Sequence, residues 1–154
     1  MAAAVHLKDI VGALEMVSDE YPAFLNLDSG EVHSIERRLL GEAEDSDDED
    51  EYEDYEKDPE WELAKQIVSS DRFVKLPTKF DIHEWEIMNQ FATAFPKARI
   101  SEELLDAIHG AGAFRTFENA IRRHHIEPAW YDFRAQALKQ IAIDWCEEHD
   151  IGWE

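Results

Sequence analysis

The chain has a single cysteine, Cys146, and no apolar run that approaches roughly 18 residues, the length that a membrane-spanning helix needs. One cysteine excludes a disulfide framework within the chain and fits a reducing compartment. The first residues also lack a basic leader followed by an apolar stretch, which is the pattern of a secretory signal. These absences predict a cytoplasmic protein that has no membrane partner.

The chain also lacks the local patterns of a metal, cofactor or catalytic centre. Cys146 and His149 stand three residues apart, and His124 adjoins His125, but neighbouring residues on a helix diverge and zinc would need two further ligands. Cys146 follows Trp145 and is predicted to be a helix residue rather than a nucleophile. The sequence therefore predicts no metal and no cofactor. A small-molecule enzyme stays a third hypothesis, because an active site assembled from distant residues leaves no local motif.

Basic residues are few, and the acidic excess is unevenly placed. Lys and Arg number 15 against 36 Asp and Glu, which gives a formal charge of −21. The stretch from Glu42 to Glu62 holds 14 acids and one lysine, so it carries −13 and leaves −8 for the rest. A segment this charged buries little apolar surface and repels itself, so we expect a disordered insertion at Gly41–Asp58. Deleting it is expected to leave folding cooperative.

The acidic segment has several interpretations. It could attract a basic protein or imitate nucleic acid through a field that salt screens over roughly 10 Å, or it could be a solubilising spacer. A calcium loop is disfavoured, because Asp50 stands where such a loop needs glycine, although Asp45, Asp47, Glu49 and Glu56 match ligand positions. The candidate interaction residues are Glu44, Asp45, Asp47, Asp48, Glu49, Asp50 and Glu51.

Outside this segment, apolar residues make up enough of the sequence to fill the core of one domain, residues 1–154. Helical spacing predicts a first helix over Leu7–Val17 and a short one from Trp61 to Val68. Ala23–Leu27 and Glu31–Ile35, joined by a turn with Gly30 in the left-handed position, predict a β-hairpin. A third strand is expected at residues 72–76, closed by Pro77.

The C-terminal half is predicted to be mainly helical. Asp81 and Glu84 form a plausible capping pair for a helix that runs to Phe95, and Ser101 opens another through Ile108. After a glycine hinge, a third helix aligns Ala113, Phe114, Phe117, Ala120 and Ile121 on one face. The last helix runs from Pro128 to about His149. The fold class is therefore α+β, a small three-stranded antiparallel sheet with a mainly helical C-terminal half.

The glycine hinge and the helix after it are the candidate anion-binding site. Glycine N–H groups at a helix N-terminus can hold phosphate, and arginine can add a bidentate contact. The simpler interpretation is a turn between helices with a solvated arginine face, because one glycine pair matches no phosphate-loop fingerprint. The candidate residues are Gly110, Gly112, Arg115, Arg122 and Arg123.

Several segments together resemble the uncharacterised bacterial protein family UPF0158. They are residues 24–32, residues 72–77, the helix with Trp85, Met88 and Phe91, and above all the Gly-Ala-Phe-Arg-x-Phe and Trp-Tyr-x-Phe-Arg motifs, at 112–117 and 130–134. The chain departs from the family, which often has lysine, at Ala111 and Glu118, and this argues against an anion grip at the hinge. The resemblance implies a bacterial cytosolic protein with this fold and implies no activity.

The leading functional hypothesis is a non-enzymatic protein-interaction or regulatory domain. Its acidic insertion and its arginine-bearing helix offer surfaces of opposite sign, and the expected partner is a protein, basic if the insertion makes the contact. The alternative is an RNA or phosphate-ligand binder that uses Arg115, Arg122 and Arg123.

Overall fold

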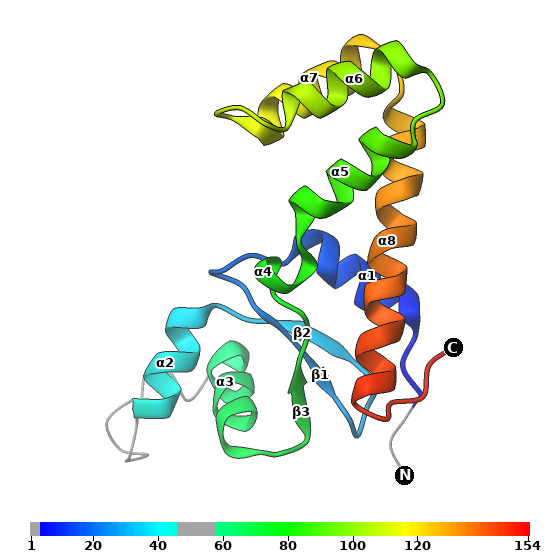
Figure 1. The fold of residues 1–154 in the computed structure, drawn as a ribbon. Helices are drawn as coiled ribbons and strands as arrows, with labels where there is room; N and C mark the ends of the chain where they lie inside the picture. Colours follow the sequence, from blue (N-terminus) through cyan, green and yellow to red (C-terminus); the bar gives the residue numbers. More distant parts are fainter. Residues whose placement is uncertain (1–3, 46–57) are drawn as a thin grey trace. The chain divides into compact units, whose positions relative to one another are not determined.

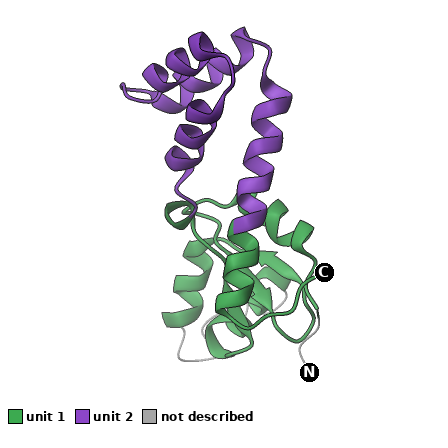
Figure 2. Cartoon of the chain, turned by 45° about the vertical axis from the view of Figure 1, so that its right-hand side comes forward, with its two compact units in different colours: residues 1–81, 141–154 green, residues 82–140 purple. Residues whose placement is uncertain are grey.

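The computed structural model describes residues 4–45 and 58–154, and these residues form two compact units. Unit 1 consists of residues 1–81 and 141–154, and unit 2 of residues 82–140 (Figure 2). A three-stranded antiparallel sheet and a mainly helical C-terminal half confirm the predicted α+β class. The division into compact units does not test whether the chain folds as one domain, so the expected single domain stays a prediction.

Unit 1 opens with α1, Leu7–Met16, which buries Leu7, Ile10 and Leu14 as their helical spacing predicts. The hairpin follows as β1, Ala23–Asn26, and β2, Val32–Ser34. Gly30 in the connecting turn has φ 76°, a left-handed angle that glycine adopts without steric cost. The predicted first helix and hairpin are confirmed.

The central strand of the sheet is β1, with β2 on one edge and β3, Phe73–Lys75, on the other (Figure 1). Both pairings are antiparallel, and Leu25 faces Val32 on one side and Val74 on the other. Ala23 and Leu25 are each only 1% exposed, so one face of β1 is buried and the strand is paired on both edges. The predicted third strand is confirmed.

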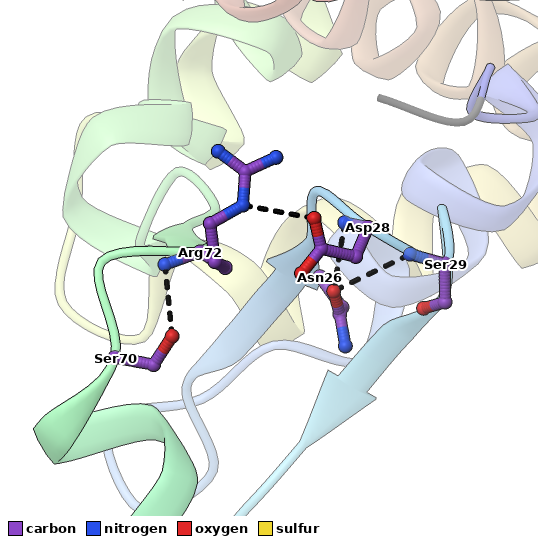
Figure 3. A network of polar contacts seen from close by, with 5 residues as sticks. All are labelled: Asn26, Asp28, Ser29, Ser70 and Arg72. Atoms are coloured by element: carbon purple, nitrogen blue, oxygen red, sulfur yellow. Dashed lines mark hydrogen bonds and ion pairs between the residues drawn. The ribbon is translucent and has the colours of Figure 1, made fainter. Parts of the chain in front are cut away.

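Side chains fasten the hairpin turn to the start of β3 (Figure 3). The amide oxygen of Asn26 accepts from the N–H groups of Asp28, at 2.9 Å, and Ser29, at 3.4 Å. Arg72 donates from Nε to Oδ1 of Asp28 at 2.9 Å, and its backbone N–H donates to the Ser70 hydroxyl at 3.1 Å. Both charged side chains are well exposed, so the ion pair contributes about 1 kcal/mol at most and serves mainly to fix the turn.

Two helices pack together beside the sheet: α2, Arg37–Asp45, and α3, Pro59–Ser69. They build a core cluster that consists of Ile35, Ala43, Trp61, Ala64 and Ile67. Phe24 of β1 and Phe73 of β3 pack against this cluster, which connects the helix pair to the sheet. Helix α2 was not predicted from the sequence.

This helix pair corrects the start of the expected acidic insertion. Gly41–Asp45 form the end of α2, and Ala43 among them is only 5% exposed. At the other end Asp58 caps α3 by accepting the N–H of Glu60 at 3.0 Å. Residues 46–57 lie outside the described residues. Because deleting Gly41–Asp58 would remove a buried side chain and a helix cap, we now expect that deletion to destabilise unit 1.

The short helix α4, Lys79–Ile82, precedes α5, Glu84–Ala94, and corrects the predicted capping pair. Thr78 and Asp81 cap α4 reciprocally: Thr78 donates its N–H to Asp81 at 2.9 Å, and Asp81 donates its own to the Thr78 hydroxyl at 3.2 Å. His83 then takes a left-handed φ of 55°, so Asp81 does not cap α5. The expected pairing of Asp81 with Glu84 is wrong.

Unit 2 continues with α6, Ala98–Ala107, which begins three residues before the predicted start at Ser101. Ser101 is not a cap. Its hydroxyl donates to the backbone oxygen of Ala92 at 2.6 Å and so joins α6 to the last turns of α5. The next helices are α7, Ala113–Arg123, and α8, Glu127–Glu148, whose residues up to 140 belong to unit 2. The three successive helices around the glycine hinge are confirmed.

An aromatic cluster forms the core of unit 2. Phe91 lies with its ring centroid 5.3 Å from that of Trp130 and 5.4 Å from that of Phe133, and Phe117 lies 4.9 Å from Trp130, all in edge contacts. Phe117 is fully buried, but Phe114, predicted on the same face of α7, is 51% exposed. Phe114 belongs to the first turn after the exposed hinge and stands outside the core.

The two phenylalanines of α7 provide a direct test of this packing. We expect Phe117→Ala to lower the free energy of unfolding by about 3–5 kcal/mol, because it leaves a cavity among aromatic rings. Phe114→Ala, the matched control, should cost less than about 1 kcal/mol. Urea denaturation of both variants measures the difference, and Phe117→Leu replaces the alanine variant if that one fails to fold. Equal losses at the two positions would contradict the assignment.

Candidate functional site

The first acids of the acidic segment belong to the end of α2, and its last acids belong to the start of α3. Glu44 and Asp45 are exposed in the last turn of α2, and Glu60 and Glu62 are exposed in the first turn of α3. We call these four side chains the acidic rim. The candidate residues Asp47, Asp48, Glu49, Asp50 and Glu51 lie outside the described residues. The acidic rim sits on the core cluster around Trp61, so its backbone is held by buried packing.

Formal charge is divided very unequally between the two units. Residues 82–140 hold seven Lys and Arg against eight Asp and Glu, a charge of −1. Hence 20 of the 21 excess negative charges fall in residues 1–81 and 141–154. Unit 1 therefore carries a strong negative field, and unit 2 is close to neutral.

The glycine hinge needs glycine at one position. Gly112 precedes α7 with a left-handed φ of 69°, and its carbonyl accepts from both the N–H and the hydroxyl of Thr116 at 3.0 Å. Gly110 has no such angle, and a Cβ at either glycine would meet nothing within 4 Å. The hinge thus turns the chain between α6 and α7. Gly112 is the position that favours glycine, because side chains disfavour its left-handed backbone angle.

The candidate arginines do not converge on the hinge. Arg115 lies in the first turn of α7, but Arg122 and Arg123 lie at its other end, about 11–12 Å further along the axis. Arg122 pairs with Glu118 across 3.7 Å, and Arg123 pairs with Glu103. Two of the five predicted anion-binding residues, Arg122 and Arg123, thus lie away from the hinge, and each is already paired with a carboxylate. Anion binding itself stays a prediction.

Glu103 also receives the side chain of His124, whose Nε2 lies 2.5 Å from its second carboxylate oxygen. One carboxylate of α6 therefore holds both Arg123 and His124 at the end of α7. The simpler interpretation from the sequence was a solvated arginine face, and Glu103 was missed as its partner because it lies twenty residues earlier and has no local pattern that marks it.

Cys146 is buried without exposed surface, and burial raises the pKa of its thiol above the ordinary value. The neutral thiol is therefore favoured, which is the opposite of an activated nucleophile. His149 directs Nδ1 to the backbone oxygen of Trp145 at 2.8 Å, and its ring lies 4.9 Å from the Trp145 ring. Within residues 4–45 and 58–154, no group of three or more His, Cys, Asp and Glu side chains is arranged to hold a metal ion.

A depression of about 590 Å³ lies between the segment after β3 and the last turns of α8, entirely within unit 1. Trp145 forms part of its wall and donates from Nε1 to the backbone oxygen of Lys75 at 3.1 Å. Carboxylates and an imidazole line it, with Asp81, Glu148 and His149 among them. About seventy residues separate its two walls, so no sequence pattern could have indicated it. Groups of these types can take part in acid and base chemistry, and Lys75 and Thr78 line the same depression.

The two motifs of the resemblance meet in the core of unit 2. Phe117 and Trp130, one from each motif, are in edge contact, and Arg134 pairs with Glu84 through Nε–Oε1 at 2.6 Å and Nη2–Oε2 at 3.4 Å. A model of the uncharacterised protein family UPF0158 matches residues 4–153. The chain belongs to this family. Searches of curated proteins and of solved structures each gave no significant match.

In this UPF0158 member the motif residues thus have mainly architectural roles. Phe117 and Trp130 fill the core, and Arg134 forms a partly buried ion pair with Glu84 of α5. Arg115 and Tyr131 are the exposed exceptions, with Phe114. Within the part of the chain that the structure describes, no helix is both long and apolar enough for a membrane span.

The buried thiol leads to a reactivity prediction that the single cysteine makes easy to read. At pH 8 we expect iodoacetamide to label Cys146 of the folded chain at least about tenfold more slowly than in urea, because burial blocks access and disfavours the thiolate. Labelling of the folded chain should begin to rise at a higher pH than labelling of the unfolded chain. Mass spectrometry follows the reaction, with Cys146→Ser as the unlabelled control. Equal rates in buffer and urea would show an accessible thiol.

Proposed function

We propose that this UPF0158 member is a non-enzymatic protein-interaction domain that binds a basic protein partner through the acidic surface of unit 1. The observation that carries the proposal is the confinement of 20 excess negative charges to unit 1, while unit 2 is nearly neutral. A field of one sign accelerates and orients the approach of an oppositely charged protein.

The acidic rim supports this function because its side chains are exposed while the helices that carry them are fixed. Trp61 is 1% exposed and Ala43 is 5% exposed, so the backbone of both helices is held in place beneath the acids. The rim therefore displays charge without needing to order a chain on binding. The acidic segment that it flanks, residues 46–59, holds nine acids and one lysine and so adds −8, half of the remaining −16 of unit 1.

The RNA or phosphate alternative receives less support. Arg122 and Arg123 already contact Glu118 and Glu103, so a phosphate would have to compete with carboxylates of the same unit. Arg122 and Arg123 also lie at the opposite end of α7 from Gly112, so of the three candidate arginines Arg115 alone stands at the helix N-terminus. We therefore keep this alternative as an outcome of the test.

Affinity capture from lysate of the source cell tests the proposal with a matched pair of variants. One variant neutralises the acidic rim with Glu44→Gln, Asp45→Asn, Glu60→Gln and Glu62→Gln. The control neutralises four exposed acids of unit 2, with Glu86→Gln, Glu102→Gln, Asp106→Asn and Asp132→Asn. We expect a basic protein that survives nuclease, is retained by the control, and is lost or strongly reduced with the rim variant and in high salt.

Two results would contradict the proposal. A nuclease-sensitive partner that the rim variant retains, and that Arg115→Glu with Arg122→Glu loses, would move the function to α7 and nucleic acid. Equal loss of the protein partner with the rim variant and with the control would show that overall charge, rather than this surface, decides binding.

A further inference from the structure

Unit 1 contains a second cavity, of about 370 Å³, whose walls come from four separate parts of the chain. They are the loop after α1, the first residues of β1, the outer face of α2, and the segment that follows β3. Backbone hydrogen bonds hold these parts in place. The backbone N–H of Arg37 donates to the backbone oxygen of Glu20 at 2.8 Å, and the backbone N–H of Leu76 donates to that of Ala23 at 2.9 Å. The volume lies within the range of small-molecule sites.

Four charged side chains line this cavity, two of each sign. Arg37 and Lys75 are the cations, and Asp19 and Glu44 are the anions. None of the ion pairs within residues 4–45 and 58–154 includes any of the four. All four residues are exposed, so a ligand in the cavity can reach their charged ends from solvent.

The remaining wall is largely apolar. Val17, Phe24, Leu40 and Leu76 contribute to it, and Leu76 is only 2% exposed. Phe24 and Leu40 also pack against the core cluster, so this part of the wall is backed by buried side chains. An apolar wall with charged groups at its edge selects a ligand that has a hydrocarbon part and a charged end.

We propose that this cavity binds a free amino acid with a branched aliphatic side chain. Its carboxylate contacts Arg37 and Lys75, its ammonium group contacts Asp19 and Glu44, and its side chain lies against Phe24 and the other apolar residues. A simple anion would face the two carboxylates, and a simple cation would face the two basic groups. A zwitterion satisfies both pairs and brings no net charge into an acidic unit.

This inference goes beyond the proposed partner binding and does not depend on it. The probe is leucine, titrated into the full chain by isothermal calorimetry. We expect saturable binding, weakened at least about tenfold by Arg37→Gln and by Lys75→Gln, since each loses a charge-assisted hydrogen bond. Arg38→Gln is the matched control: Arg38 is the next residue on α2, is exposed, pairs with Glu36 and Glu42, and does not line the cavity.

Two analogues test the two ends of the ligand. 4-Methylpentanoate lacks the ammonium group and 3-methylbutylamine lacks the carboxylate, so both should bind at least about tenfold more weakly than leucine. Amide resonances of Ala23 and Phe24 should move on leucine binding, which places the ligand independently of any substitution. Thermal denaturation checks that each variant folds.

The proposal is overturned by no binding of leucine up to about 10 mM, an affinity near the lower limit for a specific site. Binding that is unchanged in both Arg37→Gln and Lys75→Gln would place leucine elsewhere and overturn it too. Equal affinity for 4-methylpentanoate would exclude a role for the two carboxylates and with it the zwitterion.

Discussion

The pairing of β1 on both of its edges is the constraint on which unit 1 depends. The chain between β2 and β3 contains α2, the acidic segment and α3, and it returns to the sheet only because β3 pairs with the free edge of β1. Phe24 on one face of β1 supports the α2–α3 pair, while Leu25 is buried on the other face. A local sheet of short strands thus closes a loop that carries most of the charge of the protein.

This arrangement allows the chain to carry a large charge without losing its fold. Like charges within unit 1 repel one another, and such self-repulsion opposes the compact state. The structure meets this by placing four of the described acids of α2 and α3 at exposed positions, with Glu42 half-buried, and by filling the interior between the helices with Trp61 and small or aliphatic side chains. None of the buried residues that the structure describes is polar or charged, so the repulsion acts through solvent. Within unit 1 the charged side chains therefore lie at the surface, and the buried side chains that stabilise the fold are apolar.

The sequence predicted those parts of the fold that local spacing controls. The helices α1 and α8, the hairpin and β3 each have an apolar period or a turn residue that marks them. The helix α2 was missed because its buried face is small. That face is buried only by packing with Trp61 of α3, which lies beyond the acidic segment in the sequence. Asp81 was paired with Glu84 from residue types, but in the structure it pairs with Thr78. The left-handed backbone at His83 separates Asp81 from the start of α5.

The candidate sites were harder to predict, for the same reason. Arg122 and Arg123 were read as a free cationic face, but Glu103 on the preceding helix pairs with Arg123, and spacing within α7 cannot reveal it. The cavity with Arg37 and Lys75 brings together residues from four segments, and nothing in any one of them indicates the others. Local patterns predict elements, whereas ion pairs and cavities depend on which elements meet.

The measurement that tests the central claim most directly is a nuclear magnetic resonance titration of the labelled protein with an octalysine peptide. If the charge of unit 1 forms the binding surface, amide shifts should concentrate at Glu44, Asp45, Glu60 and Glu62 and disappear in high salt. Residues 82–140 should stay unchanged. Shifts that concentrate on α7, or that spread evenly over both units, would contradict the claim that the acidic surface of unit 1 is where a basic partner binds.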